Sequence, residues 1–147
     1  MSEKLRAGIL GGTGMVGQRF IALLENHPWF EVTTIAASPR SAGKTYAEAV
    51  GDRWKMTTPM PEAVKNIVVK NVNEVAEVAA EVDFVFSAVD MTKDEIKKIE
   101  EEYAKTETPV VSNNSAHRWT PDVPMVVPEI NPEHFQVIES QRKRLGT

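Results

Sequence analysis

The chain has 147 residues, with 17 Lys and Arg against 21 Asp and Glu, a formal net charge of −4 and 41% hydrophobic residues. These values are typical of one globular domain, and the acidic balance argues against nucleic acid as the main partner. The absence of cysteine excludes disulfides, thiolate metal sites and a cysteine nucleophile within this sequence. No apolar run approaches the ~18 residues of a membrane span, and no signal peptide precedes the first expected strand, so we expect a cytoplasmic protein that makes no membrane contact.

The N-terminal segment has the order strand, glycine turn, helix. The expected strand Leu5–Leu10 is followed by Gly11, Gly12, Gly14 and Gly17, and then by Val16, Phe20, Leu23 and Leu24 at helical spacing. A dinucleotide site requires this order: Gly11 or Gly12 turns the chain, Gly14 lets the backbone approach a pyrophosphate, and Gly17 allows close packing of the helix. The start of the helix would offer N–H donors to the phosphates. The alternative is a glycine-rich turn without a ligand.

The second expected strand, Phe30–Ala37, ends in a basic loop. An NAD site would place Asp or Glu about 20 residues after the glycines to hold the ribose hydroxyls. The loop has no acid and instead offers Arg40, Lys44 and the hydroxyls of Ser38 and Ser41. A guanidinium beside hydroxyl groups suits a ribose 2′-phosphate, which favours NADP over NAD. A solvated basic loop is the alternative.

Strands and helices alternate along the rest of the chain. Strands are expected over 67–70, 82–88 and 109–111, and helices over 74–80 with Asn73 as cap, over 92–105 with Glu100–Glu102 on a solvated face, and from Asn131 onward with Phe135 and Ile138 facing inward. The alternation predicts an α/β fold, Rossmann-like and doubly wound, with a mostly parallel sheet flanked by helices.

Small polar residues follow two of these strands. Ser87 and Ala88 end one, and the string from Ser112 to Ser115 ends the next, at the edge where open α/β sheets bind ligands. Arg118 follows closely and could clamp an anion through two hydrogen bonds, or form a surface ion pair.

Several segments together resemble the N-terminal domain of the aspartate-semialdehyde dehydrogenase family, in its archaeal and fungal branch. The matching segments are GILGGTGMVGQRF, AASPRSAGK, VDFVFSA, VVSNNSAHRW, DVPMVVPEIN and IESQRKRLGT, which cover nearly the whole chain in the same order. The glycine motif is common to many folds, whereas ASPRSAGK, SNNSAHRW and VPEIN are much more specific.

This resemblance implies the reversible conversion of aspartyl phosphate to aspartate semialdehyde with NADPH and release of phosphate, on the route to lysine, threonine and methionine. It implies cofactor contacts at Gly11, Thr13, Gly14, Met15, Val16, Gly17, Ser38, Arg40, Ser41, Ser87, Ala88 and Asn113, and substrate or phosphate contacts at Asn114 and Arg118. The full-length enzyme would be a homo-oligomer.

The catalytic residues of that family do not match this sequence. Its nucleophile is a cysteine and its base is a histidine of a second domain, but this sequence has no cysteine, and His27, His117 and His134 do not occupy the base position. We therefore expect residues 1–147 to form an NADP-binding domain that ends before the catalytic and dimerisation domain and is inactive alone. Apolar surface would be exposed where the second domain packs.

Other functions remain open at this stage. Malonyl-CoA reductase and other acyl-CoA reductases share the scaffold, and N-acetyl-glutamyl-phosphate reductase is a more distant possibility. A short-chain dehydrogenase needs Tyr-x-x-x-Lys, which neither tyrosine satisfies, because Tyr46 is followed by Val50 and Tyr103 by Glu107. A nucleotide-binding module without chemistry is the alternative from another class.

Overall fold

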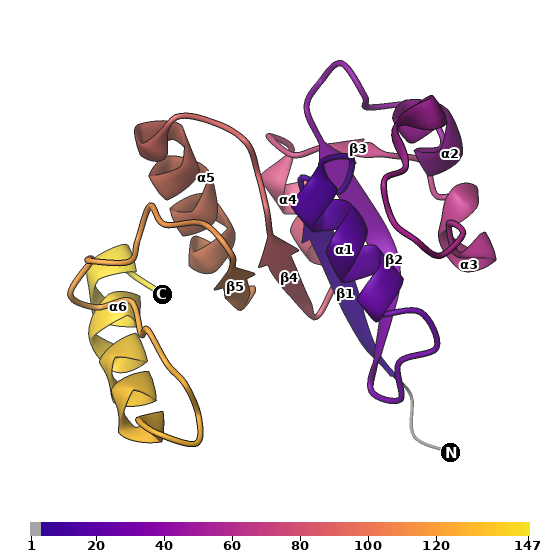
Figure 1. The fold of residues 1–147 in the computed structure, drawn as a ribbon. Coiled ribbons are helices and arrows are strands. Elements are labelled where there is room, and N and C mark those ends of the chain that lie inside the picture. Colours follow the sequence, from indigo (N-terminus) through magenta and orange to yellow (C-terminus); the bar gives the residue numbers. More distant parts are fainter. Residues whose placement is uncertain (1–3) are drawn as a thin grey trace.

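The computed structural model describes residues 4–147, and its centre is a five-stranded parallel sheet in the order β3-β2-β1-β4-β5 (Figure 1). The strands are β1 (Leu5–Leu10), β2 (Phe30–Ala37), β3 (Lys70–Asn71), β4 (Phe84–Ser87) and β5 (Val110–Ser112). From β1 the chain adds β2 and β3 on one side, and then crosses over to add β4 and β5 on the other side of β1. This confirms the expected doubly wound fold, and its switch point lies between β1 and β4.

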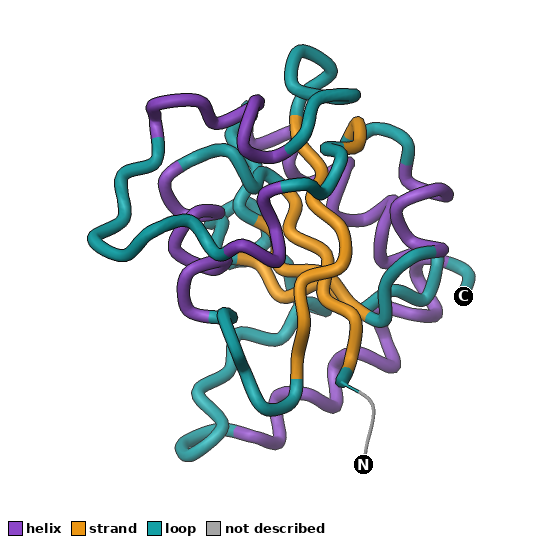
Figure 2. Tube along the Cα trace, turned by 90° about the vertical axis from the view of Figure 1, so that its right-hand side faces the viewer, coloured by secondary structure: helices purple, strands orange, loops and turns teal. Residues whose placement is uncertain are grey.

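Helices cover both faces of the sheet (Figure 2). One hydrophobic cluster joins the sheet to α1 (Met15–Leu23), α2 (Tyr46–Val50) and α3 (Glu62–Lys65), and the other joins it to α4 (Val75–Ala80) and α5 (Lys93–Lys105). A short 3₁₀ helix, η1 (Gly51–Arg53), follows α2, and the C-terminal segment holds the 3₁₀ helix η2 (Pro132–Val137) and α6 (Ile138–Leu145). No helix within residues 4–147 is long and apolar enough to cross a membrane.

The apolar stretches at residues 7–10 of β1 and 35–37 of β2 follow from burial on both faces. Ile9 and Ile35 enter the cluster under α1, while their neighbours Leu10 and Ala36 enter the cluster under α4 and α5, and all four are fully buried. A parallel strand covered on both sides needs apolar residues at every position, in contrast to the alternating pattern of a one-sided strand. The predicted bounds of β1 and β2 are confirmed for the same reason.

The predicted cap of α4 is wrong. Glu74 occupies the N-cap position without a side-chain cap, and the Asn73 N–H donates to Asn71 Oδ1 at 2.9 Å. The Asn71 side chain therefore closes a turn directly after β3, and α4 begins at Val75, one residue later than a cap at Asn73 predicts.

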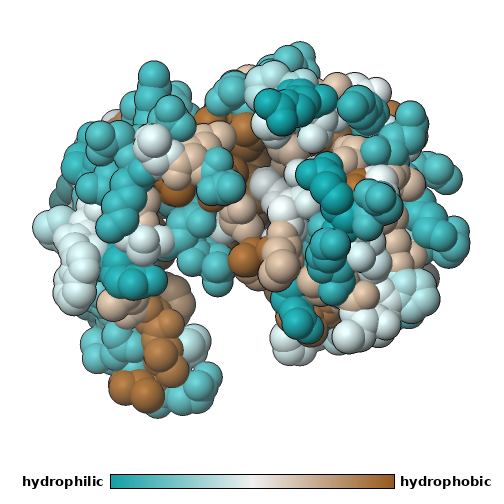
Figure 3. All heavy atoms as spheres, turned by 45° about the horizontal axis from the view of Figure 1, so that its top comes forward, coloured by the Kyte–Doolittle hydropathy of each residue, from teal (hydrophilic) through white to brown (hydrophobic). Residues whose placement is uncertain are grey.

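The C-terminal segment also differs from the prediction. Phe135 is 47% exposed and Ile138 is 38% exposed, so the expectation that both face inward is wrong. Figure 1 shows α6 beyond α5, away from the sheet, and Figure 3 shows hydrophobic atoms gathered on this projecting arm. The expected exposed apolar surface is therefore present, and α6 ends at Gly146, which has a left-handed φ of 76°.

Candidate functional site

The turn between β1 and α1 contains several glycines, and a different structural constraint requires glycine at each of positions 11, 12 and 17. Gly11 has a φ of 80°, and a Cβ there would lie 2.7 Å from the Ala88 carbonyl carbon, so Gly11 makes the turn beside the end of β4. A Cβ on Gly12 would lie 2.5 Å from Ile35 Cγ2, and one on Gly17 would lie 2.6 Å from Gly12 Cα. The predicted close packing at Gly17 is confirmed, and β1, β4 and α1 meet at van der Waals distance.

Gly14 differs from these glycines because its bare side faces open space. A Cβ there would meet only Gly11 O, at 3.8 Å, and Gly14 is exposed. It is also the N-cap of α1 and supplies no side-chain cap, whereas Thr45 and Thr92 cap α2 and α5. The first-turn N–H groups of α1 are thus left for solvent or for an anionic ligand that approaches past Gly14.

Two buried side chains that were not anticipated from the sequence hold this turn. The Tyr46 hydroxyl donates to Gly12 O at 2.7 Å, and Gln18 Nε2 donates to Thr13 O at 3.0 Å and to Arg53 O at 3.1 Å. Burial raises the pKa of the Tyr46 hydroxyl above its ordinary range, so Tyr46 remains a donor. Two turn carbonyls are therefore bound to the protein itself, which suits a turn that presents N–H groups to an anion.

The loop after β2 carries positive charge that no acidic residue of the described chain pairs with. Arg40 and Lys44 are exposed and form no ion pair with any residue between 4 and 147. The Ser41 N–H donates to Ser38 O at 3.0 Å, which closes a turn around Arg40. Since Gly11 N–H donates to Ala36 O at 2.8 Å, this loop starts next to the glycine turn.

The ends of β4 and β5 are joined by polar contacts. Ser87 is fully buried, its carbonyl accepts from the Asn113 N–H at 2.9 Å, and its hydroxyl accepts from Asn114 Nδ2 at 3.3 Å. Ala88 N–H donates to Leu10 O at 2.8 Å, which places this pair beside the glycine turn. The structure therefore brings Ser87, Ala88, Asn113 and Asn114 to the same edge of the sheet as the turn.

Glu100 belongs to this polar group, which corrects the expectation of a solvated face. Its side chain reaches from α5, is only 4% exposed, and accepts from Ser112 Oγ at 2.5 Å and from Asn114 Nδ2 at 3.1 Å. The signal was present in the helical spacing, because Glu100 is four residues after Ile96 and three before Tyr103, both of which are buried.

Arg118 lies farther along, in a separate surface hollow of about 530 Å³ that Trp119 and His134 also line. Its guanidinium forms no ion pair within the described chain, so the alternative of a surface ion pair is not realised there. The neighbouring His117 is buried. Its Nε2 lies 3.1 Å from Lys97 O, which ties this segment to α5, and its Nδ1 lies 3.0 Å from Thr120 Oγ1 within the segment itself.

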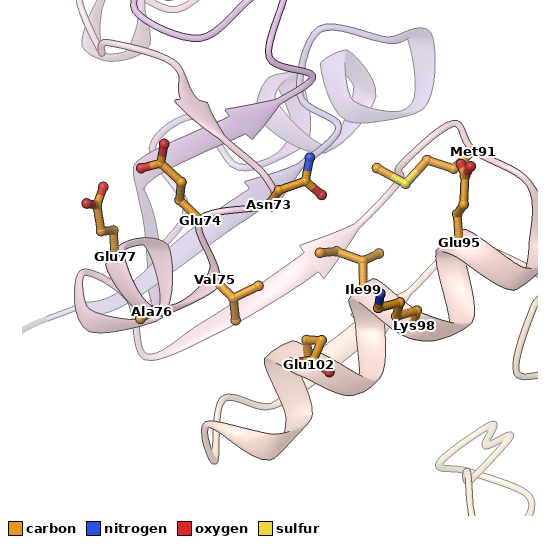
Figure 4. A pocket seen from close by; sticks show the side chains of 10 residues that line it. All are labelled: Asn73, Glu74, Val75, Ala76, Glu77, Met91, Glu95, Lys98, Ile99 and Glu102. Atoms are coloured by element: carbon orange, nitrogen blue, oxygen red, sulfur yellow. The ribbon is translucent and has the colours of Figure 1, made fainter.

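Another hollow lies between α4 and α5 and measures about 1050 Å³ (Figure 4). Glu74, Glu77, Glu95 and Glu102 line it with a single cation, Lys98. Glu77 raises the pKa of Glu74, first by a hydrogen bond between the side chains and then by charge repulsion. So acidic a hollow repels phosphates, which makes the carboxyl edge of the sheet the better site for an anionic ligand.

Comparison with known proteins also indicates a dinucleotide-binding domain. The family described as "Semialdehyde dehydrogenase, NAD binding domain" matches residues 6–138. The chain is 47% identical to the aspartate-semialdehyde dehydrogenase of Aspergillus fumigatus and 46% identical to that of Methanothermobacter thermautotrophicus. Each match covers 97% of this chain but 38% and 39% of those two proteins, so the chain spans about two fifths of the length of these relatives.

Solved structures agree. The Candida albicans aspartate semialdehyde dehydrogenase with NADP matches with a TM-score of 0.83 and 44% identity, over 97% of this chain and 38% of that one. An aspartate semialdehyde dehydrogenase II from Vibrio cholerae, complexed with ASA, matches with a TM-score of 0.68 and 26% identity over 94% and 40% of the two chains. By sequence and by fold, this chain belongs to the semialdehyde dehydrogenase NAD-binding domain family.

Proposed function

We propose that residues 1–147 form the NADP-binding domain of an aspartate-semialdehyde dehydrogenase. The reaction would be the reduction of aspartyl phosphate to aspartate semialdehyde with NADPH and release of phosphate. The observation that carries the proposal is the order of groups along the carboxyl edge of the sheet. The uncapped start of α1 lies between the exposed Arg40 after β2 and the polar ends of β4 and β5.

This order matches the parts of a dinucleotide. The 2′-phosphate of the adenosine would bind at Ser38, Arg40 and Ser41, because a guanidinium and two hydroxyls suit a phosphate dianion. The pyrophosphate would bind along the β1–α1 turn, and the nicotinamide half would cross the switch point to β4 and β5. The proposed contacts on that path are Gly11, Thr13, Gly14, Met15, Val16 and Gly17 for the pyrophosphate, and Ser87, Ala88 and Asn113 for the nicotinamide half.

The chemistry would need more than this chain contributes. The bound cofactor supplies the hydride, while Asn114 and Arg118 are the proposed contacts to the substrate and its phosphate. Since the sequence contains no cysteine, we propose that the 147-residue chain binds NADP and does not reduce the substrate alone. A homo-oligomeric full-length enzyme in the cytoplasm remains the corresponding prediction for the whole protein.

Calorimetric titration with NADP and with NAD tests the cofactor assignment. We expect a preference for NADP, and Arg40→Ala should lower NADP affinity by about tenfold or more, because a charged hydrogen bond contributes about 1.5–3 kcal/mol. NAD affinity should stay the same in Arg40→Ala. Arg142→Ala is the control, because it removes a cation of the distant α6 that pairs with Glu107, and it should leave the affinities for NADP and NAD unchanged. Preference for NAD, or an unchanged NADP affinity in Arg40→Ala, would contradict the assignment.

A further inference from the structure

Glu100 is a buried carboxylate to which the proposed function gives no role. It is 4% exposed, and no Lys, Arg or His between residues 4 and 147 forms an ion pair with it. Its bonded partners are neutral donors at the end of β5, Ser112 Oγ and Asn114 Nδ2. A buried charge costs free energy that such donors only partly offset, so the position of Glu100 needs a reason beyond stability.

The contacts of Glu100 determine which way the Asn114 amide points. Asn114 Nδ2 donates to Glu100 Oε2 at 3.1 Å, so the amide nitrogen, and not Oδ1, faces the Glu100 side chain. The second hydrogen of Nδ2 goes to Ser87 Oγ at 3.3 Å. In addition, Ser112 Oγ accepts from the Asn114 backbone N–H at 2.9 Å, which fixes the backbone of the same residue.

Oδ1 of Asn114 is then the free end of the amide. Oδ1 has no hydrogen-bond partner in residues 4–147. Within those residues, the fully buried side-chain atom that lacks a partner is Thr33 Oγ1, so Asn114 Oδ1 is not fully buried. Oδ1 is therefore an accessible acceptor at the carboxyl ends of β4 and β5. These strands and the Arg40 loop lie on opposite sides of β1, and the nicotinamide half of the dinucleotide would lie on the side of β4 and β5.

We propose that Glu100 is a positioning residue that holds Asn114 with Oδ1 as an acceptor for the nicotinamide half of NADP. The ligand groups that fit are donors, the carboxamide N–H and the hydroxyls of the nicotinamide ribose. This inference rests on the proposed function, and it adds a cofactor contact to the substrate role given above to Asn114. Glu100 acts only through Asn114 and Ser112 and touches no ligand.

The test compares two replacements and two ligands. Glu100→Met keeps the volume but removes the acceptor, so the Asn114 amide is free to turn over; Glu100→Gln keeps one acceptor oxygen. The ligands are NADP and 2′-phospho-ADP-ribose, which lacks the nicotinamide. We expect Glu100→Met to weaken NADP about tenfold, as for the loss of one good hydrogen bond, and to leave 2′-phospho-ADP-ribose within about twofold. Glu100→Gln should recover most of the NADP affinity.

Controls separate positioning from a general structural effect. Glu102→Met makes the same exchange on the same helix at a carboxylate that pairs with Lys105, and it should leave both affinities unchanged. Thermal unfolding checks that each variant folds. If Glu100→Met does not fold, Ser112→Ala takes its place, because it removes the acceptor of the Asn114 N–H, and it should also weaken NADP selectively.

The possible results are distinct. An equal loss for both ligands, or no loss of NADP affinity in a folded Glu100→Met or Ser112→Ala variant, would overturn the positioning role. If the unmodified chain binds neither ligand, the proposed function fails first and Glu100 loses this role with it. Selective loss of NADP with recovery in Glu100→Gln supports the proposal.

Discussion

Replacement of Gly17 by alanine should loosen the contact on which the glycine turn depends. The new Cβ would lie 2.6 Å from Gly12 Cα and 3.0 Å from the Gly11 carbonyl carbon. Non-bonded carbons rest about 3.5–4.0 Å apart, so α1 would have to move outward by about 1 Å. The obstacle is backbone and cannot rotate away, which puts the cost near the upper end of overpacking, about 3 kcal/mol.

Part of this cost is offset, because alanine is favoured over glycine inside a helix by about 1 kcal/mol. Urea unfolding followed by tryptophan fluorescence should therefore show a loss of about 2 kcal/mol in the free energy of unfolding, with an unchanged m value. NADP affinity should fall as well, because the turn moves with the helix.

Gly14→Ala is the matched control. Its Cβ would meet only Gly11 O, at 3.8 Å, so the free energy of unfolding should change by less than about 1 kcal/mol while NADP affinity falls. The reasoning would be refuted if Gly17→Ala unfolded at the same urea concentration as the parent, or if both variants lost the same stability.

The two tyrosines of the chain give two further predictions. Tyr46→Phe leaves the buried Gly12 carbonyl without its 2.7 Å hydrogen bond, which should cost about 1–3 kcal/mol in the free energy of unfolding and also weaken NADP binding; an unchanged urea midpoint would contradict this. Burial raises the pKa values of Tyr46 and Tyr103 above their ordinary range, so the folded chain holds protons that the unfolded chain releases above pH ~10. Stability is then complete below pH ~10 and falls as the pH rises further, and absorbance at 295 nm should show tyrosine ionisation only together with unfolding. Ionisation of either tyrosine in a chain that is still folded by circular dichroism would count against the burial argument.

The parts of the fold that could be predicted are those in which local pattern and burial agree. The apolar stretches that end β1 and β2 predicted buried parallel strands, and the glycines between β1 and α1 predicted close packing. The polar ends of β4 and β5 could be assigned to the ligand edge because parallel strands bring their carboxyl ends together.

The parts that could not be predicted depend on contacts between distant segments. Tyr46 holds the turn through Gly12, 34 residues away, and Gln18 joins the turn at Thr13 to Arg53, which is 35 residues from Gln18. Nothing local distinguishes the two side chains from ordinary helix residues. Glu100 was misassigned because three consecutive acids were treated as one surface, although successive helical residues are turned by about 100° and only Glu100 points inward. Phe135 and Ile138 carry a buried pattern, but within residues 4–147 they remain 47% and 38% exposed.

The most direct test of the whole account is a nuclear magnetic resonance titration of the ¹⁵N-labelled 16.3 kDa chain with NADP. The account predicts that the amide shifts change at the carboxyl edge of the sheet: in the β1–α1 turn, in the loop around Arg40, and at the ends of β4 and β5 that carry Ser87 and Asn114. The acidic hollow between α4 and α5 should stay unchanged. Shifts concentrated in that hollow, with none in the glycine turn, would contradict the assignment of the site.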